Sequence, residues 1–344
     1  MRFALAPEQR DFADSLRKMC DAAGTPAIIR AWGRGDHRSG RGLIRQLAGA
    51  GTLGLIVDED HGGMGAEAVD LVVACVELGR AAVPGPLVET AAAIPALLQA
   101  LPDAGPAKRW LGAFAEGAAL GTIAPSSTNA VALDADTAEV ILAVEGDRLY
   151  TARRTGPVRS VDAARRLFTI AADELVAEGD VVRDAAAAAF DAGALAVSAQ
   201  LLGAGRALLD ISVAYVKQRH QFGKPIGQYQ AIKHHLANAL IGLEMAQPLV
   251  YGAALSTDAA KADHALAATR SRDVSAAKIA CAEAAYRTAR TALQVHGAIG
   301  YTAECDLSLW LTKVTALQSA WGTADFHRAR VAAALRDTDE SEAA

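Results

Sequence analysis

The chain has few aromatic residues, few cysteines and no surplus of basic charge. Aromatic side chains make up 5% of its 344 residues, and the formal net charge is −5. A dedicated nucleic-acid-binding protein normally carries a basic face, so this balance argues against that class of protein. The four cysteines are scattered, with no CxxC or His-paired spacing, so we expect buried free thiols in a reducing cytoplasm and no metal site.

The sequence also offers no targeting or membrane-spanning segment. Its first residues, Met1 to Ala4, do not form the charged and apolar regions of a signal peptide. The longest apolar stretch, residues 192–209, contains Gln200, Arg206 and several glycines, which favours a buried core helix over a membrane span. We therefore predict a cytoplasmic protein without membrane insertion.

Hydrophobic residues are abundant at 52%, and alanine dominates them. Alanine and leucine at high density favour helix over sheet. We predict an N-terminal helical domain over residues 1–117, a small β domain over 118–190 and a bundle of four long helices over 191–344. The β domain is predicted from short apolar runs at 139–144, 148–152, 167–171 and 181–183, with turns between them. The last helix is predicted to run unbroken over 307–335.

The turn between the first two long helices carries an unusual motif. From Arg219 to Gln230 it reads R-x-Q-F-G-x-P-I-x-x-Y-Q. Gly223 and Pro225 break the helix by different means, one through backbone freedom and the other by lacking an N–H group. The Arg219 guanidinium, the Phe222 ring and free backbone N–H groups then lie near a helix N-terminus, where an anion is favoured.

A second motif ends the third long helix. Residues 294–304 read Q-V-H-G-A-I-G-Y-T-A-E. Gly297, Ala298 and Gly300 leave the surface bare, so the pyrophosphate of a cofactor can approach the backbone closely. Gln294 can donate a hydrogen bond to it. An ordinary helix C-cap with glycine at its end is the alternative interpretation.

Together the two motifs resemble those of the acyl-CoA dehydrogenases, flavoproteins that desaturate acyl-CoA thioesters. The resemblance implies that family's fold, mainly α with a small β middle domain: an N-terminal helical domain, a β-barrel domain that is reduced here, and a C-terminal four-helix bundle. It also implies that FAD is the cofactor, and that both motifs reach across a subunit interface to hold the adenosine-diphosphate half of a neighbour's FAD. The residues that take these parts are Arg219, Phe222, Ile226, Gln230, Gln294, Gly297 and Ala298, with Thr323 as a further cofactor contact.

The catalytic carboxylate that the resemblance leads us to expect is missing. The reaction needs a base for the α-proton of the thioester, and many family members carry it as Glu in an E-G-T segment. Here that segment reads Trp321-Gly322-Thr323, and an indole cannot take up a proton at neutral pH. Other members place the Glu on the helix before the first motif, where this chain has Gly193, with Asp191 the nearest carboxylate.

The loops that cradle the flavin ring in this family are also reduced. A T-E-P-x-x-G-S-D segment survives only as residues 122–127, and a W-I-T-[NS] segment has no counterpart. We therefore predict one subunit of a heteromeric acyl-CoA dehydrogenase, an α2β2 assembly with a homologous subunit that supplies the catalytic Glu. The short, base-less chain resembles those of bacterial steroid degradation, with electron-transfer flavoprotein as the acceptor.

Two alternatives stay open. One is a self-sufficient homo-oligomeric dehydrogenase in which Asp191 or another carboxylate is the base. The other is a non-catalytic subunit that binds acyl-CoA or supports assembly without flavin.

Overall fold

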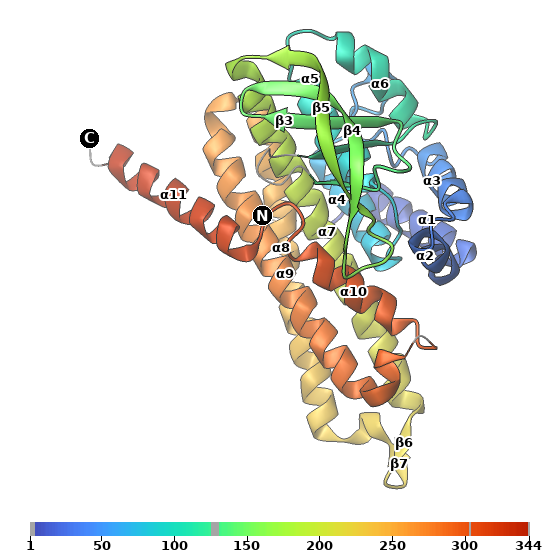
Figure 1. Ribbon diagram of the computed structural model, residues 1–344. Coiled ribbons are helices and arrows are strands. Elements are labelled where there is room, and N and C mark those ends of the chain that lie inside the picture. Colours follow the sequence, from blue (N-terminus) through green and yellow to red (C-terminus); the bar gives the residue numbers. More distant parts are fainter. Residues whose placement is uncertain (1–3, 125–130, 303, 343–344) are drawn as a thin grey trace.

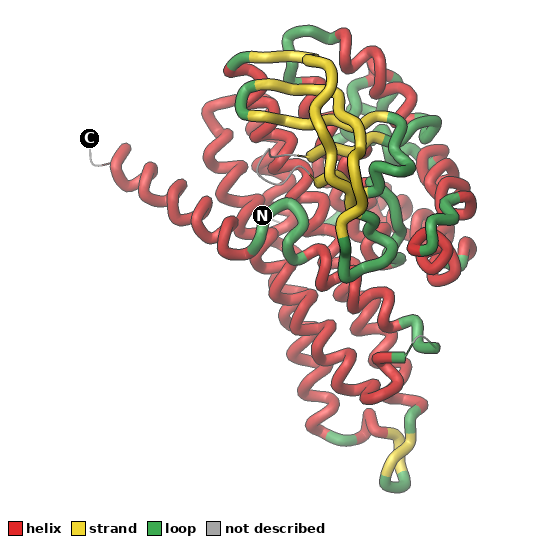
Figure 2. The backbone as a smooth tube through the Cα atoms, viewed as in Figure 1, coloured by secondary structure: helices red, strands yellow, loops and turns green. Residues whose placement is uncertain are grey.

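The computed structural model describes residues 4–124, 131–302 and 304–342. Short N-terminal helices and a small sheet lie together at one end of a bundle of long helices, as Figure 1 shows. A two-stranded hairpin closes the other end, and the last helix projects away from the body. Coloured by secondary structure, the chain is mostly helix, with strands confined to the sheet and this hairpin (Figure 2). The predicted architecture, mainly helical with a small β domain, is confirmed.

The N-terminal part is built of short helices. The first begins at Pro7, whose fixed φ suits a first helical turn, and ends before Gly24, which is left-handed with φ 66°. A second helix follows directly, with Pro26 in its first turn, and the sequence did not lead us to expect it. The elements are α1 Pro7–Ala23, α2 Thr25–Gly33, α3 Arg38–Gly49, η1 Glu59–His61, α4 Ala68–Arg80, the π-helical turn η2 Glu89–Ala93, α5 Ile94–Gln99 and α6 Gly105–Ala115.

The sheet has five strands in the order β1-β3-β4-β5-β2, among the described residues. Only the β1–β3 pair is parallel. The two edge strands, β1 and β2, lie close together, so the sheet curls toward a barrel. A small core of its own contains Phe168 and Ile170. The strands are β1 Gly121–Ala124, β2 Val131–Leu133, β3 Val140–Glu145, β4 Arg148–Val158 and β5 Leu167–Glu178.

The central element is α7, which spans Asp180–Gln218. It begins earlier than predicted, and the strand predicted at 181–183 is wrong because these residues form its first turn. Within the described residues α7 alone is long and apolar enough to cross a membrane, but 78% of its most apolar window is buried, as in a core helix. It crosses α4 at very short range, since a Cβ on Gly203 would lie 1.9 Å from the Val76 carbonyl oxygen.

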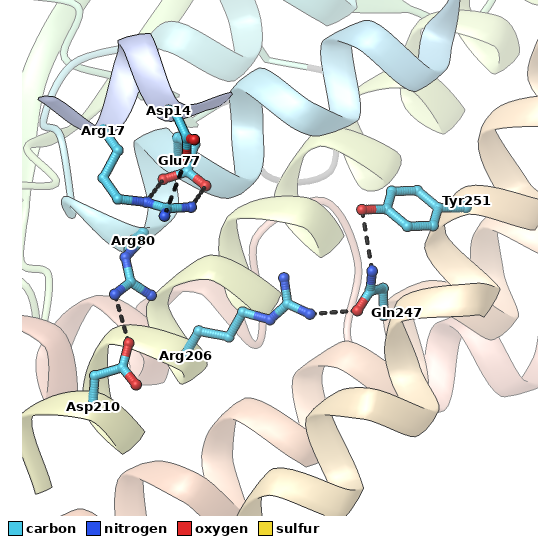
Figure 3. A network of polar contacts seen from close by, with 8 residues as sticks. All are labelled: Asp14, Arg17, Glu77, Arg80, Arg206, Asp210, Gln247 and Tyr251. Atoms are coloured by element: carbon cyan, nitrogen blue, oxygen red, sulfur yellow. Dashed lines mark hydrogen bonds and ion pairs between the residues drawn. The ribbon is translucent and has the colours of Figure 1, made fainter. Parts of the chain in front are cut away.

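Polar side chains join the same helices at their edges, as Figure 3 shows. Arg17 of α1 donates to both carboxylate oxygens of Glu77 on α4, at 3.0 and 2.7 Å. Arg80 at the end of α4 pairs with Asp210 of α7 at 2.5 Å. These contacts fix the N-terminal helices against the bundle.

The rest of the bundle differs from the prediction at one point. The predicted helix over 307–335 is two helices, broken where Trp321 and Gly322 adopt φ values of 56° and 99°. The division into domains at 117 and 190 stays a prediction. The remaining elements are β6 His220–Gln221, β7 Lys224–Pro225, η4 Ile226–Gln228, α8 Gln230–Ala262, η5 His264–Leu266, α9 Ala267–His296, η6 Gly297–Tyr301, α10 Leu307–Leu317 and α11 Ala324–Glu342.

Candidate functional site

The first motif forms the hairpin β6–β7 at the far end of the bundle (Figure 1). Arg219 ends α7 in an extended conformation, and its carbonyl oxygen accepts from the Ile226 N–H at 2.8 Å, which closes the hairpin. Phe222 and Gly223 make the tip, with φ values of 51° and 82°. Phe222 is 91% exposed, and the Arg219 and Gln230 side chains are also exposed. An exposed aromatic ring beside an arginine is suited to contact a molecule outside this chain.

The second motif lies at the same end, because the ends of α7 and α9 are in contact. The ring of Tyr215 stacks on that of His296 with centroids 4.1 Å apart. His296 is buried and its Nδ1 bonds to the Ala292 carbonyl at 2.8 Å, so it packs the two helices together. Beyond it, Gly297 has φ 62°, and a Cβ built there would meet nothing within 4 Å.

The surface around Gly297 is therefore bare. Gln294, Gly297 and Ala298 are all exposed. Exposed backbone at a left-handed glycine, with an amide side chain beside it, can approach and bond to an anionic group.

Thr323 is not brought together with the other seven predicted cofactor residues. Its Oγ1 accepts from the Phe326 N–H at 3.3 Å at the start of α11. It lines a surface hollow with Tyr286 of α9, and Tyr286 lies about 15 Å from His296 along that helix at 1.5 Å per residue. One bound group cannot touch both Thr323 and the bare surface unless it spans that distance.

A larger cavity, of about 590 Å³, lies between the sheet and the turn that joins α10 to α11. Phe190 of α7, Trp321 and Phe326 form its aromatic side, and Arg159 and Arg165 contribute positive charge. Phe190 lies about 43 Å from Arg219 along α7, again at 1.5 Å per residue. The cavity and the hairpin surface therefore cannot hold the two ends of one dinucleotide.

The two positions where the family carries its catalytic Glu are in contact, and one of them, Trp321, lines this cavity. The indole of Trp321 lies on Gly193, where a Cβ would come within 2.5 Å of the ring. Neither position carries a carboxylate, and the indole fills the space that a side chain at 193 would need.

Trp321 is held there by side chains from α9 and α11. Lys278 donates to the carbonyls of Gln318 and Gly322 at 3.0 and 3.1 Å. His327 Nε2 bonds to the Trp321 carbonyl at 2.8 Å and its Nδ1 to the Ser275 hydroxyl at 3.0 Å. Burial lowers the pKa of Lys278 to about 8 and that of His327 to about 4. The imidazole is thus neutral, and this network assigns its proton to Nε2, so that Ser275 donates to Nδ1.

Asp191 does not lie free in the cavity. It is fully buried, and its two oxygens accept from Arg270 Nε at 2.8 Å and Arg330 Nη2 at 2.6 Å. It does not line the cavity that contains Trp321. Two guanidinium groups occupy its oxygens, so neither oxygen is free to accept a proton from a substrate, which argues against a role as the base.

The carboxyl group that does line this cavity is Glu89, which the sequence analysis missed. Its only sequence signal is that it is the single charged residue between Arg80 and Asp103. It is 4% exposed, and its Oε1 accepts from Trp321 Nε1 at 3.2 Å. Burial raises its pKa.

The predicted flavin-loop remnant at 122–127 is described only in part. Thr122 lies in β1 and is buried, whereas 125–127 lie outside the described residues. Among the described residues no group of three His, Cys, Asp or Glu side chains could hold a metal ion.

Comparisons with known proteins agree over most of the chain. Two family models match: "Acyl-CoA dehydrogenase, N-terminal domain" over residues 6–118 and "Acyl-CoA dehydrogenase, C-terminal domain" over 183–336. Acyl-CoA dehydrogenase IpdE2 of Mycobacterium tuberculosis is 31% identical over 312 residues, which cover 89% of this chain and 91% of that protein.

Two similar solved structures come from complexes of two proteins. The ChsE4–ChsE5 complex of M. tuberculosis matches with a TM-score of 0.83 at 20% identity, covering 98% of this chain and 99% of that chain. The Tcur3481–Tcur3483 steroid ACAD variant matches with a TM-score of 0.83 at 21% identity, covering 97% and 99%. At these identities the likeness concerns the fold.

The residues of this chain fit FAD in two separate places. The bare backbone at Gly297 and the exposed Arg219 suit a diphosphate, while the aromatic side of the cavity suits a flat ring. Structural neighbours were solved with FAD or its reduced form. With matching family models, a relative of similar length and the same fold, the chain belongs to the acyl-CoA dehydrogenase family, and its cofactor is FAD.

Proposed function

We propose that this chain is the base-less subunit of a heteromeric acyl-CoA dehydrogenase, which desaturates an acyl-CoA thioester between its α and β carbons. The observation that carries the proposal is the contact of Trp321 with Gly193. Both positions for the catalytic Glu lack a carboxylate, and Asp191 is occupied by two arginines. The base therefore comes from a homologous partner subunit.

The hairpin surface supplies the contribution of this chain to that partner. Arg219, Phe222, Ile226 and Gln230 with Gln294, Gly297 and Ala298 face outward at one end of the bundle. The length of α7 keeps them far from the cavity of their own chain. They hold the adenosine-diphosphate half of an FAD whose ring lies in the neighbour. Thr323 contacts a different part of the bound cofactor.

The partner docks on the apolar face of α8. Ile241, Met245 and Leu249 are spaced four residues apart, so they share one helix face, and they are 58%, 70% and 45% exposed. A soluble chain rarely leaves such a stripe uncovered. The similar complexes of two proteins support an unlike partner and an α2β2 assembly, and one of them supports a steroid-derived acyl group. Electron-transfer flavoprotein accepts the electrons.

Co-expression with a candidate homologous subunit tests the proposal. We expect a yellow complex that oxidises steroid-derived acyl-CoA with electron-transfer flavoprotein as acceptor, whereas the chain alone is colourless and inactive. Arg219→Ala with Phe222→Ala in this chain should lower the flavin content of the complex, and Arg10→Ala, an exposed arginine on α1, serves as the control. A yellow, active homo-oligomer of this chain would overturn the proposal, and a colourless complex would favour the flavin-free assembly role.

A further inference from the structure

A buried carboxyl group with an unused oxygen lines the cavity of this chain. Glu89 opens the π-helical turn η2, and it is the single acidic residue among the described residues that line the 590 Å³ space. The remaining lining is apolar or aromatic, apart from hydroxyl groups and the two arginines, Arg159 and Arg165. Glu89 is thus the acidic group in a lining that is otherwise apolar, aromatic, hydroxylic or basic.

The position of Glu89 is fixed by its neighbours. Thr90, the next residue, donates from its hydroxyl to the Gly121 carbonyl at 2.9 Å and accepts from the Gly121 N–H at 3.1 Å. This reciprocal pair ties η2 to strand β1. On the other side, Trp321 Nε1 donates to Oε1 of Glu89 at 3.2 Å. Since Lys278 and His327 hold the Trp321 turn, the carboxyl is oriented from two directions.

The second oxygen, Oε2, is buried and has no hydrogen-bond partner in the part of the chain that the structure describes. A charged carboxylate with one neutral donor and one unpaired oxygen is costly in such a place. Burial raises the pKa of Glu89, and this effect outweighs the opposing influence of Arg165, the Trp321 hydrogen bond and Lys313. The neutral acid relieves this cost, and it carries an O–H group that can donate.

We propose that Glu89, oriented by Trp321, is a specificity-determining residue: its unpaired carboxyl oxygen carries an O–H group that donates to a carbonyl oxygen of the uncharged group that fills the cavity. Two groups carry such an oxygen, the flavin ring and the acyl group of a thioester. The identity of these ligands rests on the proposed function, whereas the state of the carboxyl does not.

The protonation state is tested first, on the full chain. Infrared difference spectra between wild type and Glu89→Gln at neutral pH should show the band of a protonated carboxyl that only the wild type contains. Glu116→Gln, at an exposed position on the N-terminal part, should show only the loss of a carboxylate. Loss of a carboxylate band in Glu89→Gln would overturn the proposal, whether or not the chain assembles with a partner.

Ligand binding is tested on the complex with the homologous subunit. The affinity of the complex is measured for acetoacetyl-CoA and butyryl-CoA, which differ by one ketone oxygen. Its affinity for FAD is measured to test donation to the flavin ring. Glu89→Gln keeps a hydrogen-bond donor and should bind the ligands with wild-type affinity. Glu89→Leu has no donor, so it should bind the ligand whose carbonyl oxygen accepts from Glu89 about two- to tenfold more weakly. Loss for acetoacetyl-CoA relative to butyryl-CoA identifies the acyl group, and loss for FAD identifies the ring. Equal affinities in both variants, or equal losses in both, would contradict donation by Glu89.

Discussion

The Trp321 indole packs directly against the backbone of Gly193, although 128 positions of sequence separate the two residues. The indole lies where a side chain at 193 would project, so Trp321 leaves no room there for a residue larger than glycine. A glutamate at 193 could not be accommodated without moving the indole. Trp321 therefore accounts for the missing carboxylate at both positions.

Gly193→Ala should lower the free energy of unfolding by about 1–3 kcal/mol, because the new methyl overlaps the indole. In a Trp321→Ala background the same change should become neutral or slightly stabilising, since the space is vacated and alanine is the better helix former. Urea denaturation of the four proteins gives the coupling energy. Additive effects would show that the two residues do not compete for space.

The close crossing of α4 and α7 gives a second prediction. Gly203→Ala should destabilise by about 1–3 kcal/mol, because its Cβ would lie against the Val76 carbonyl. Gly252→Ala is the matched control, since it lies within α8 with nothing within 4 Å of the added Cβ. That variant should gain about 0.5–1 kcal/mol. Thermal or urea unfolding of the pair checks both signs together.

Asp191 should matter for stability and not as a proton acceptor. Asp191→Ala leaves Arg270 and Arg330 without their buried partner, so we expect a loss of about 3–5 kcal/mol in chemical denaturation. Asp325→Ala removes an exposed partner of Arg328 and should cost about 0–1 kcal/mol. A stable Asp191→Asn complex that binds FAD but cannot turn over would instead support the base.

Stability should fall on mild acidification because of His327. Burial lowers its pKa to about 4 in the folded chain, against about 6.5 when unfolded, so the unfolded chain binds more protons between these values. Stability is full above pH 6.5 and is lost toward pH 4 by up to about 1.4 kcal/mol per pH unit. His327→Gln should flatten this part of the profile, while His235→Gln, at an exposed position, should not.

The apolar face of α8 predicts an assembly defect. Met245→Asp should prevent association with the partner while leaving the unfolding free energy within about 0.5 kcal/mol, because its side chain is 70% exposed. Leu175→Asp, on β5 and 51% exposed, is the control. Sedimentation of the co-expressed complex is the measurement. An intact complex with Met245→Asp would place the interface elsewhere.

Local sequence signals predicted the elements they punctuate. The short apolar run over 139–144, followed by a turn, predicted β3. The break between α10 and α11 could not be predicted, because the left-handed Trp321 is stabilised by Lys278 and His327 from other helices. The spacing of apolar residues along a helix does not indicate such tertiary contacts.

In the candidate site, too, the residues that are close in sequence could be predicted and those joined by tertiary contacts could not. The two motifs were readable because their residues are close in sequence, and the structure brings them to one end of the bundle. Their role in binding FAD stays a prediction. Glu89 could not be found by spacing, since its partner Trp321 lies at the other end of the chain, and a lone acid in an apolar run can also be a surface residue.

The length of α7 has a consequence for the assembled enzyme. One continuous helix runs from the aromatic cavity to the hairpin at the far end of the bundle. Each inserted residue would move the hairpin by about 1.5 Å and rotate it by about 100°. In the proposed assembly, a single uninterrupted segment would therefore fix the spacing and orientation of cofactor sites in different subunits, and insertions within it should be far less tolerated than in the loops at either end.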